Sequence, residues 1–459
     1  MSTPLPISTN SEMSATGRWP ALPEHVWRVR TWTIDDPGSL LDHLPETDSV
    51  AWVRRAEGLV GWGVAAHLEV SGDERFSRAQ RWWNEWLRTA NIDDPLQQAG
   101  TGPVAFASFT FDPNPQSPPS ASVDSTQTSQ VVIPRVIVGR RDGLAWVTVI
   151  ERADAQAESA PHLTIGRDVA AAPMSMPEVP LNITWEQGST SAEDWQKAVA
   201  IAISRINNGE LDKVVLARDI VARSTNAIDS RFVLQRLGHE YPECWTFQVA
   251  GLLGATPELL VRRTGDEVMS RVLAGTVKRR GDESEDASLA AELLGSGKDL
   301  AEHEYAVRSV ARALSTHCTD LDVPYRPRVL RLPNVQHLAT DVTGQLVDGA
   351  PVLALAASLH PTAAVCGTPT ERAFDLIRDL EGMDRDRYAG PVGWFDSRGD
   401  GEFGIALRCA QISDDQRSLR LFAGCGIVSA SDPEAELAES LAKFLPIQQA
   451  VHPAASTTT

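Results

Sequence analysis

Residues 208–219 read NGELDKVVLARD, and this stretch predicts a buried β-strand that begins at a lysine. β-Branched residues crowd a helix but pack well on a pleated sheet, so the run that follows Lys213 favours a strand. Side chains alternate between the two faces of a strand. One face would therefore carry Lys213, Val215 and Ala217, so that the pleat can aim the amine at a cleft while the other face anchors the sheet.

An amphipathic helix precedes this strand, and further strands follow it. Residues 185–212 have helical spacing, with Ser191 or Ser189 as a plausible cap and Gly209 as the stop. The strand candidates are KVVLARDIVAR, CWTFQVAGL, ELLVRRTGDEVMSRVLAG, NVQHLATDVTGQL, GPVGWFDSRGDGEFGIALRCAQI and SLRLFAGCGIV. Turn signals such as RTGDE and SRGDGE join several strands, which predicts largely antiparallel or mixed sheets in an α/β (α+β) fold.

The chain is long for a single hydrophobic core, with 459 residues of which 42% are hydrophobic. We expect either two domains or one large α/β unit. Composition and pattern divide the chain into a disordered start (1–16), a β-rich N-terminal part (17–184), a region of alternating strands and helices (185–447) and a disordered tail (448–459). Residues 112–130 have the composition of a flexible surface loop between two strand-like runs.

The charge of the chain argues against polyanions as its main partners. There are 42 Lys and Arg against 61 Asp and Glu, which gives a formal net charge of −19. Such a charge repels nucleic acid and acidic membrane surfaces, so we expect neither as a partner. A small anionic substrate would need a local cationic or metal site.

The cysteines and the apolar runs indicate a cytoplasmic protein. The five cysteines are widely spaced and form no CxxC or CxH pair, which predicts neither a disulfide framework nor a zinc site. No apolar run approaches the ~20 residues that cross a bilayer. The first residues also lack a basic start followed by an apolar stretch, so we expect no export.

Two predicted helices carry acidic residues at helical spacing. Asp299 and Glu302 are three residues apart in KDLAEHEYAVRSVARAL, and Glu436 and Glu439 are three apart in SDPEAELAESLAKFLP, a helix that Pro446 is expected to end. If the two helices face one another, these carboxylates could hold a Mg²⁺ ion and leave room for water and a substrate carboxylate. Each pair alone also fits a solvated helix face.

Other residues allow both a functional and a structural interpretation. The glycines in LAGT and AGCGIV could let backbone N–H groups approach an anion, or could form tight turns. Arg408 could grip a carboxylate or form a structural ion pair. His337 and His360 stand alone in apolar settings typical of core histidines, and no second histidine lies at metal spacing from His303. The sequence has no GxSxG, GxxxxGK[ST] or strand-linked GxGxxG motif, so hydrolase, NTPase and dinucleotide-binding functions lose their usual support.

Several short runs, taken in order over about residues 190–446, resemble the chorismate-utilising enzymes, which include isochorismate, salicylate and anthranilate synthases. The runs are ELDKVVLAR, GATPELL, RVLAGT, SGKDLAEHEYAV, LPNVQHLAT, LHPTAAVCGTP, YAGPVGW, FGIALRCA, AGCGIV and SDPEAELAESLAKF. The resemblance implies one large unit of two antiparallel sheets packed face to face, with outer helices and a central active-site cleft that the N-terminal half completes. It also implies chorismate as the small-molecule substrate and Mg²⁺ as the cofactor, and we expect a monomer.

The resemblance assigns roles to individual residues. Glu302 and Glu439 resemble the principal metal ligands, and Asp299 and Glu436 resemble the accessory acids. Glu258 resembles the general acid that protonates the departing C4 hydroxyl group, a role that needs a pKa raised by burial. The residues implied to bind substrate are Gly275, Thr276, His337, Ala364, Arg408, Gly424 and Gly426.

Lys213 distinguishes the reactions of this family. Anthranilate synthases use ammonia and have an amide residue there, whereas attack by water needs a base, which a partly desolvated lysine can provide. Salicylate synthases typically have threonine where Ala364 stands, and some aminodeoxychorismate synthases have a nucleophilic lysine where Ala274 stands. Ala363 departs from the proline that many relatives have.

These positions imply a Mg²⁺-dependent isochorismate synthase, in which Lys213 activates water for attack at C2. Salicylate synthase, anthranilate synthase component I and a chorismate-binding regulator are the alternatives. Menaquinone and siderophore synthesis both use the isochorismate step, and the sequence favours neither.

Overall fold

Strand β9 (Lys213–Arg223) begins at the predicted lysine, and helix α2 (Ala192–Asn207) precedes it. The Ser191 hydroxyl group accepts a hydrogen bond from the Asp194 amide at 2.9 Å and caps the helix. Gly209 follows with a φ of +75°, a left-handed conformation that glycine adopts without strain. Both predicted elements are therefore confirmed, with Ser191 as the cap, but the helix is shorter than the predicted range 185–212, because Thr184–Gln187 form a strand.

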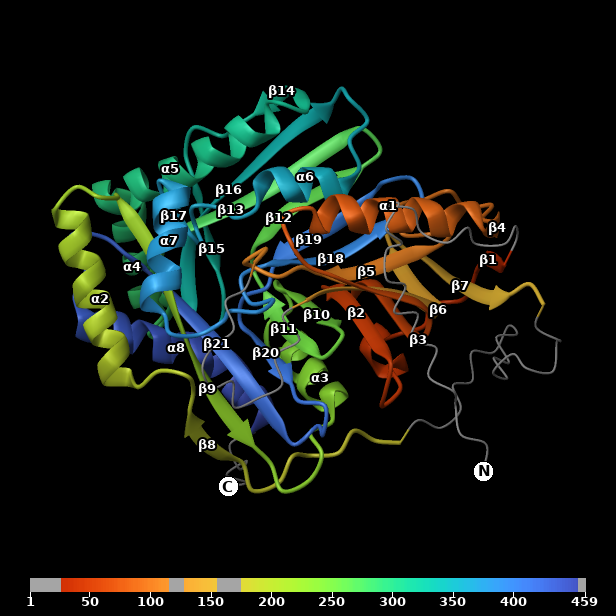
Figure 1. Cartoon of the computed structure of the whole chain (residues 1–459), viewed down its shortest axis with the longest axis horizontal. Helices are drawn as coiled ribbons and strands as arrows, with labels where there is room; N and C mark the ends of the chain where they lie inside the picture. Colours follow the sequence, from red (N-terminus) through yellow and green to blue (C-terminus); the bar gives the residue numbers. More distant parts are fainter. Residues whose placement is uncertain (1–25, 115–127, 155–174, 453–459) are drawn as a thin grey trace.

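The computed structural model describes residues 26–114, 128–154 and 175–452, without the side chains of Lys298 and Glu302 (Figure 1). The predicted disordered start and most of the predicted loop at 112–130 lie outside these residues. None of the helices in the described ranges is long and apolar enough to cross a membrane.

The first strands form an N-terminal sheet in which every pair is antiparallel except β1 with β4. Its strands are β1 (Trp27–Thr33), β2 (Ser49–Arg54), β3 (Glu57–Val70), β4 (Ala90–Asp93), β5 (Val104–Ser108), β6 (Ser129–Arg141) and β7 (Leu144–Arg152). Strands β2 and β5 each also pair with a strand from the second half of the chain, β10 and β18 respectively. The N-terminal sheet therefore continues into the rest of the molecule at two places.

Two arms of antiparallel strands extend from the N-terminal sheet. The first arm runs from β2 through β10 (Trp245–Val249), β11 (Leu252–Thr256), β20 (Cys409–Ile412) and β21 (Ser418–Ile427) to β9, with β8 (Thr184–Gln187) and β17 (Gly367–Thr368) beside β9. The second arm runs from β5 through β18 (Pro391–Asp396), β19 (Gly401–Ile405), β12 (Leu259–Thr264) and β13 (Glu267–Lys278) to β16 (Val335–Leu346), with β14 (Cys318–Asp322) and β15 (Arg328–Arg331) beside β16. The predicted α/β (α+β) fold built on antiparallel sheets is confirmed.

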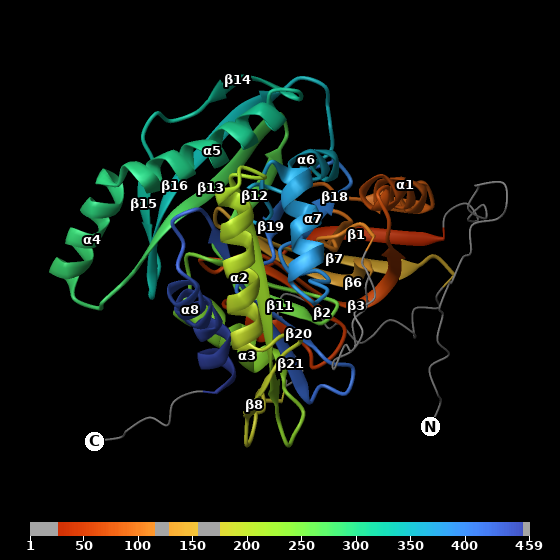
Figure 2. The same ribbon diagram turned by 60° about the vertical axis from the view of Figure 1, so that its left-hand side comes forward.

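Helices cover the two arms on the outside. Helix α5 packs on β13 and β16, α8 packs on β21, and α2 and α7 pack on β9; α5 and α8 lie one above the other in both views (Figure 1 and Figure 2). The helices are η1 (Leu40–His43), α1 (Arg75–Arg88), α2, α3 (Ser230–Glu240), α4 (Glu283–Gly295), α5 (Gly297–Leu314), α6 (Val352–Leu359), α7 (Thr370–Leu380) and α8 (Pro433–Val451).

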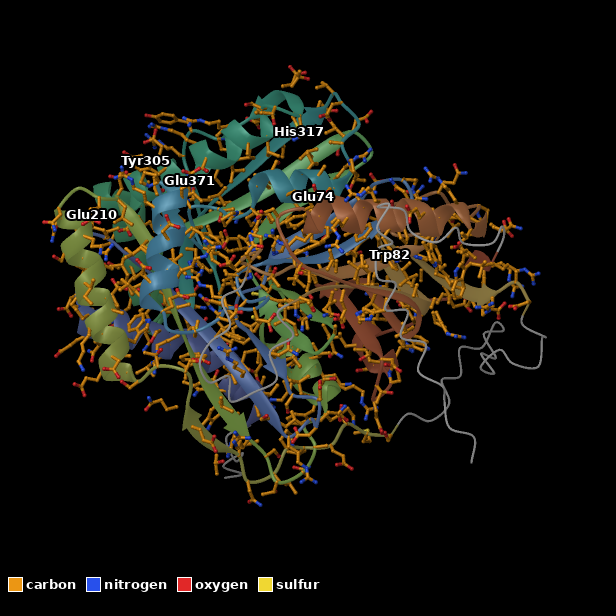
Figure 3. All side chains as sticks on the ribbon, viewed as in Figure 1. Glu74, Trp82, Glu210, Tyr305, His317 and Glu371 are labelled. Atoms are coloured by element: carbon orange, nitrogen blue, oxygen red, sulfur yellow. The ribbon has the colours of Figure 1, made fainter. Side chains whose placement is uncertain are left out.

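The charged residues lie mostly on the outside of this framework. Figure 3 shows Glu74 at the start of α1, Glu210 after α2 and Glu371 in α7, and all three residues are exposed. The apolar side chains fill two buried clusters between the sheets and helices.

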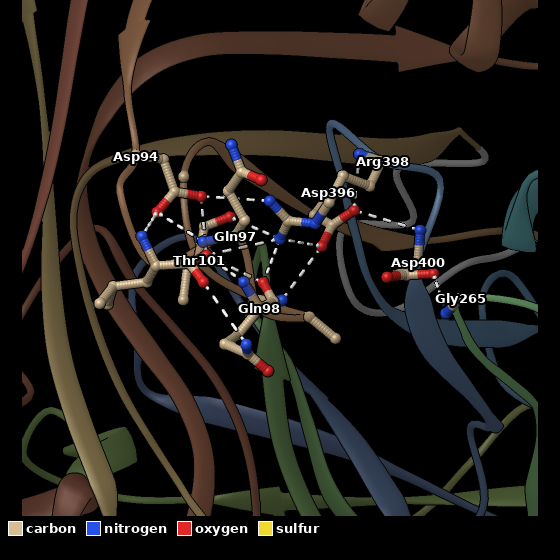
Figure 4. A network of polar contacts seen from close by, with 12 residues as sticks. Asp94, Gln97, Gln98, Thr101, Gly265, Asp396, Arg398 and Asp400 are labelled. Carbon is tan, nitrogen blue, oxygen red and sulfur yellow. Dashed lines mark hydrogen bonds and ion pairs between the residues drawn. The ribbon is translucent and has the colours of Figure 1, made fainter.

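A network of polar contacts ties the N-terminal half to the second arm (Figure 4). Arg398, in the turn between β18 and β19, donates to Asp94 Oδ2 at 3.1 Å and to Asp396 Oδ2 at 2.9 Å. The Gly100 amide donates to the same Asp396 oxygen at 3.0 Å. The loop at 94–101 is thereby fixed against a turn that lies some three hundred residues later in the sequence.

Helix α8 continues to Val451, so the prediction that Pro446 ends it is wrong. The predicted disordered tail is corrected as well, because residues 448–451 are helical; residues 453–459 lie outside the description. A proline inside a helix removes one hydrogen bond, at a cost of about 3 kcal/mol. Phe444, Ile447 and their neighbours bury enough apolar surface on the same helix to offset that cost.

Candidate active site

A cleft of about 280 Å³ opens between the ends of the two arms. Its walls come from β9 and β21 on the first arm, from β13 and β16 on the second, and from helices α5 and α8. The predicted site residues that line it are Lys213, Glu258, Gly275, Thr276, Asp299, His337, Ala364, Arg408, Gly424, Gly426, Glu436 and Glu439. The side chain of Glu302, a predicted metal ligand, lies outside the described part of the structure.

Lys213 lines the cleft at the start of β9. Lys213 lies opposite Thr368 of β17 in the sheet, and the amide of the preceding residue, Asp212, donates to the Thr368 carbonyl at 2.8 Å. Val215 also lines the cleft, whereas Val214 between them is fully buried on the other face. The predicted alternation of this strand is confirmed, and it turns the lysine towards the cleft.

Glu258 lies just after β11 and is 6% exposed, although it lines the cleft. Burial raises the pKa of its carboxyl group to about 8, against the opposing effect of the Arg408 and Lys213 charges. The group is therefore largely protonated at neutral pH. A proton held at neutral pH is what a general acid requires.

The backbone of β13 bulges beside the cleft. The register with β16 shifts between Ala274 and Thr276, and Gly275 at the bulge has a φ of +77°. A Cβ atom added there would lie 3.2 Å from Asp299 Cβ, so the glycine allows α5 to approach β13 closely. On the other side of the bulge, the Thr276 hydroxyl oxygen lies 2.8 Å from His337 Nδ1.

His337 and His360, for which the sequence allows a core or a functional role, differ in position. His337 lines the cleft; burial, with the charges of Arg408 and Lys443, lowers its pKa to about 3, so the ring is neutral. Its Nε2 has no hydrogen-bond partner within the described residues and remains available to a ligand. His360 is a core histidine, since its Nε2 donates to the Phe111 carbonyl at 3.1 Å. The core interpretation therefore holds for His360, whereas His337 lies in the cleft, as the family resemblance implies.

Acidic side chains of α8 gather on one wall of the cleft. Ligand atoms of Cys425, Glu436 and Glu439 lie within 4.8 Å of one another, and Asp299 lines the same cleft. Burial raises the pKa of Glu439 and the charge of Lys443 lowers it, with a net lowering, so the carboxylate is ionised. Mg²⁺ prefers one or two carboxylates together with water and substrate oxygens. The carboxylates of this group therefore fit a hard divalent cation, whereas the Cys425 thiol, which donates to the Glu436 carbonyl, does not.

Several residues of the cleft were not found from the sequence, and three of them carry a long polar side chain: Lys443, Arg385 and Tyr388. Lys443 is 15% exposed, and its Nζ lies 2.6 Å from Glu439 Oε1 and 2.7 Å from the Gly424 carbonyl. Its spacing of four residues from Glu439 is that of a helical ion pair and could have indicated it. Arg385 and Tyr388 reach the cleft from the segment between α7 and β18, where no local spacing marks them.

The cleft therefore combines three kinds of group. Arg408 and Lys443 provide positive charge for an anionic ligand. The backbone of Arg408 is in the left-handed region, with a φ of +48°. The acidic wall could hold a divalent cation for a second anionic group. The amine of Lys213 and the protonated Glu258 line the same cleft, and Glu258 can donate a proton to a ligand there. This arrangement suits proton-coupled substitution on a small molecule with two carboxylates.

The chain is similar to several proteins of known activity. It matches the family described as "Chorismate binding enzyme" over residues 31–452. It is 33% identical over 405 residues to the isochorismate synthase MenF of Bacillus subtilis, covering 86% of this chain and 85% of that one. It is 33% identical over 418 residues to the salicylate biosynthesis isochorismate synthase of Pseudomonas aeruginosa, covering 88% and 85%. The solved structure of MenF, the menaquinone-specific isochorismate synthase of Escherichia coli, is similar with a TM-score of 0.74 and 25% identity, covering 94% and 95%.

Proposed function

Because the chain belongs to the family of chorismate-binding enzymes, we propose that it is an isochorismate synthase, which converts chorismate reversibly to isochorismate. In this reaction water adds to ring carbon C2 and the hydroxyl group at C4 departs. The observation that carries the proposal is that Lys213 and the protonated Glu258 line one cleft. The first supplies a base for the attacking water, and the second supplies an acid for the departing hydroxyl group.

The two carboxylates of chorismate would bind to opposite kinds of group. Arg408, Lys443 and the backbone N–H groups around Gly424 would hold one carboxylate. Glu439 and Asp299, with the other acids of that wall, would hold a Mg²⁺ ion. A bound Mg²⁺ ion would neutralise the ring carboxylate and draw electron density from the ring.

Lys213 would take a proton from the attacking water. Water is a weak nucleophile, so a base that removes a proton during the attack lowers the barrier. A lysine amine on a flexible stem is suited to this role, whereas a guanidinium group would stay charged. The backbone pairing of Lys213 with Thr368 fixes the base of that stem beside the cleft.

Glu258 would give its proton to the oxygen at C4, so that water leaves in place of hydroxide. One proton passes from the attacking water to Lys213 and one passes from Glu258 to the leaving group, so the protons balance. In the reverse direction the protonated amine and the carboxylate exchange these roles. The raised pKa of Glu258 supports this assignment because the acid must hold its proton until the bond at C4 breaks.

Ala364 supports isochorismate as the final product. It lines the cleft, and its small side chain offers no hydroxyl group to the ring. Salicylate formation would need a further loss of pyruvate, and anthranilate formation would need ammonia in place of water. The curated relatives described above carry isochorismate synthase names, which also favours the water reaction.

The proposal is tested by incubating the purified protein with chorismate and Mg²⁺, with and without ammonium, and identifying the products by mass spectrometry. We expect isochorismate in both mixtures, in equilibrium with chorismate. Salicylate and pyruvate as the main products, or an aminated ring that forms only with ammonium, would contradict the proposal. Tight binding of chorismate without any turnover would identify a regulator.

A further inference from the structure

Two neighbouring chain segments carry Lys213 and Ala364, which both line the cleft. Strand β9 carries Lys213, and the loop at 362–366 carries Ala364. Backbone contacts join the segments next to the lysine, where Lys213 pairs with Thr368 and the Val215 amide donates to the Cys366 carbonyl at 2.8 Å. Closer to Ala364, a buried side chain continues this connection.

That side chain is Arg385, which donates to one carbonyl group on each segment. Its Nη1 donates to the Val365 carbonyl at 2.8 Å, and its Nη2 donates to the Val215 carbonyl at 2.7 Å. Val365 is the neighbour of Ala364, and Val215 is two residues after Lys213. The planar guanidinium group therefore sets the separation of the two segments beside the predicted base.

Glu381 holds the guanidinium group in place. Arg385 Nε donates to Glu381 Oε2 at 2.9 Å, and Arg385 Nη2 donates to Oε1. The same Oε1 accepts the amide of Ala217 in β9 at 2.7 Å, and the Phe111 ring lies 4.2 Å from Arg385 Cζ. The side chains of the pair are 3% and 1% exposed. The pair thus contacts β9 at both Val215 and Ala217.

Stability alone is a weak reason for such a pair. Both charges lose their water when they are buried, and apolar side chains of similar volume often stabilise a fold as well or better. Apolar side chains would fill the space, but they would not fix the separation of two carbonyl groups. The geometry that the pair imposes is therefore its distinctive contribution.

We propose that Arg385, held by Glu381, is a positioning residue that sets the place of the Lys213 amine relative to Ala364 and the ring between them. This inference rests on the proposed function, since it concerns the placement of the base that activates water. Binding of the substrate carboxylate would be unaffected, because Arg408 and Lys443 belong to other elements. The clamp should therefore affect kcat and leave KM nearly unchanged.

The first test replaces Arg385 by lysine, which keeps the charge but cannot hold both carbonyl groups and the carboxylate in one plane. Arg387→Lys is the matched control: Arg387 is fully buried and also donates to two carbonyl groups, those of Val249 at 3.1 Å and Ala250 at 2.8 Å, but does not line the cleft. We expect R385K to lower kcat by about 100-fold, as displacement of a catalytic group by about 1 Å can do, with KM for chorismate nearly unchanged. R387K should keep a far larger kcat.

A second variant keeps the test decisive if R385K folds poorly. Glu381→Asp retains both charges but draws the carboxylate back by one methylene group, so it should also lower kcat selectively. Hydrogen exchange measured by mass spectrometry should become faster at Val215 and Ala217 in both variants, and circular dichroism should show a retained fold. Equal loss of kcat in R385K and R387K, or a rise in KM that accounts for the loss, would overturn the inference.

The outcomes separate this inference from the proposed function. A wild-type enzyme that makes no isochorismate refutes the proposed function, whatever the variants do. A wild-type enzyme that makes isochorismate, together with an R385K variant of equal kcat, refutes the positioning role and leaves the proposed function intact.

Discussion

Lys443 and Glu439 form an ion pair across one turn of α8, with Nζ 2.6 Å from Oε1, and the same ammonium group donates to the Gly424 carbonyl at 2.7 Å. The pair joins the two charged sides of the cleft, because Glu439 belongs to the acidic wall and Gly424 to the part of β21 that would receive a substrate carboxylate. A divalent cation at Glu439 would compete with Lys443 for the carboxylate and free the ammonium group for the substrate.

Glu439→Gln should weaken the dependence of activity on Mg²⁺, since an amide is a poorer ligand for a hard cation than a carboxylate. We expect the Mg²⁺ concentration for half-maximal turnover to rise by roughly tenfold or more. Titration of the chelator-treated enzyme with MgCl₂ measures this shift. Glu434→Gln, at an exposed acid in the first turn of the same helix, should leave the titration unchanged. Full activity of the wild-type enzyme in excess chelator would refute the metal site.

Glu258→Gln should keep the shape of the side chain and remove its proton donor. Loss of a general acid typically costs about 10²- to 10⁴-fold in rate, and we expect kcat to fall within that range. Chorismate affinity, measured by isothermal titration calorimetry with Mg²⁺ present, should change little. For the wild-type enzyme, kcat should fall as the pH rises through about 8, where Glu258 loses its proton. A variant that retains wild-type turnover would exclude Glu258 as the acid.

The same substitution should change how stability depends on pH. The pKa of Glu258 rises from 4.5 to about 8 in the folded protein, so the folded state keeps this proton to a higher pH than the unfolded state does. The stability linked to the group is full below 4.5 and is lost as the pH rises through about 8. Between these values, the free energy of unfolding of the wild-type protein should fall relative to that of E258Q, by on the order of 1 kcal/mol per pH unit. Urea titrations at several pH values test this difference.

Lys213→Ala should remove the base and strongly reduce hydroxylation, while chorismate and Mg²⁺ still bind. The loss of kcat should again lie in the range of about 10²- to 10⁴-fold that general-base catalysis contributes. Lys197→Ala serves as the control, because Lys197 is an exposed lysine of α2 paired with Asp194 at the surface. Wild-type rates of isochorismate formation in K213A, followed by liquid chromatography, would contradict the role of the lysine.

His360→Gln should reduce the acid sensitivity of the fold. Burial and the charge of Arg75 lower the pKa of His360 from 6.5 to about 3, so the unfolded chain takes up a proton that the folded protein does not. The stability linked to this group is present above 6.5 and is lost as the pH falls towards about 3. The loss should reach about 1.4 kcal/mol per pH unit in the wild-type protein and be absent from the H360Q curve. An exposed histidine, His452, provides the control substitution.

The local sequence pattern was enough to predict those elements whose geometry depends only on neighbouring residues. The strand at Lys213, the Ser191 cap and the antiparallel hairpins depend on residues within one turn or one strand. The acids of α5 and α8 could be paired only as a hypothesis, because helical spacing places residues on one face but does not say which face meets which.

The missed features depend on contacts between distant segments. The Arg385 side chain donates hydrogen bonds to the backbone carbonyl groups of Val215 and Val365. Every residue has such a carbonyl group, so the sequence does not indicate which ones an arginine will contact. The passage of α8 through Pro446 depends on how much apolar surface its last turns bury, which only the packed structure shows. For His337 the residues alone left both a core and a binding role open, since an apolar neighbourhood in sequence does not distinguish a core from a cleft wall; only the family resemblance pointed to the cleft, where the residue lies.

The pairing of β2 with β10 and of β5 with β18 limits which mutations of the gene, substitutions or truncations, the fold can tolerate. These ladders place Trp52 opposite Phe247 and Phe106 opposite Trp394, and their backbone hydrogen bonds do not depend on which side chains the strands carry. The pairing itself therefore tolerates substitutions in these strands, although Trp52 and Phe106 are also buried in the core. The N-terminal half as a whole cannot be lost, because a gene truncated to residues 185–447 would encode a protein in which β10 and β18 each have a newly unpaired edge, and each copy would then offer those edges to the next.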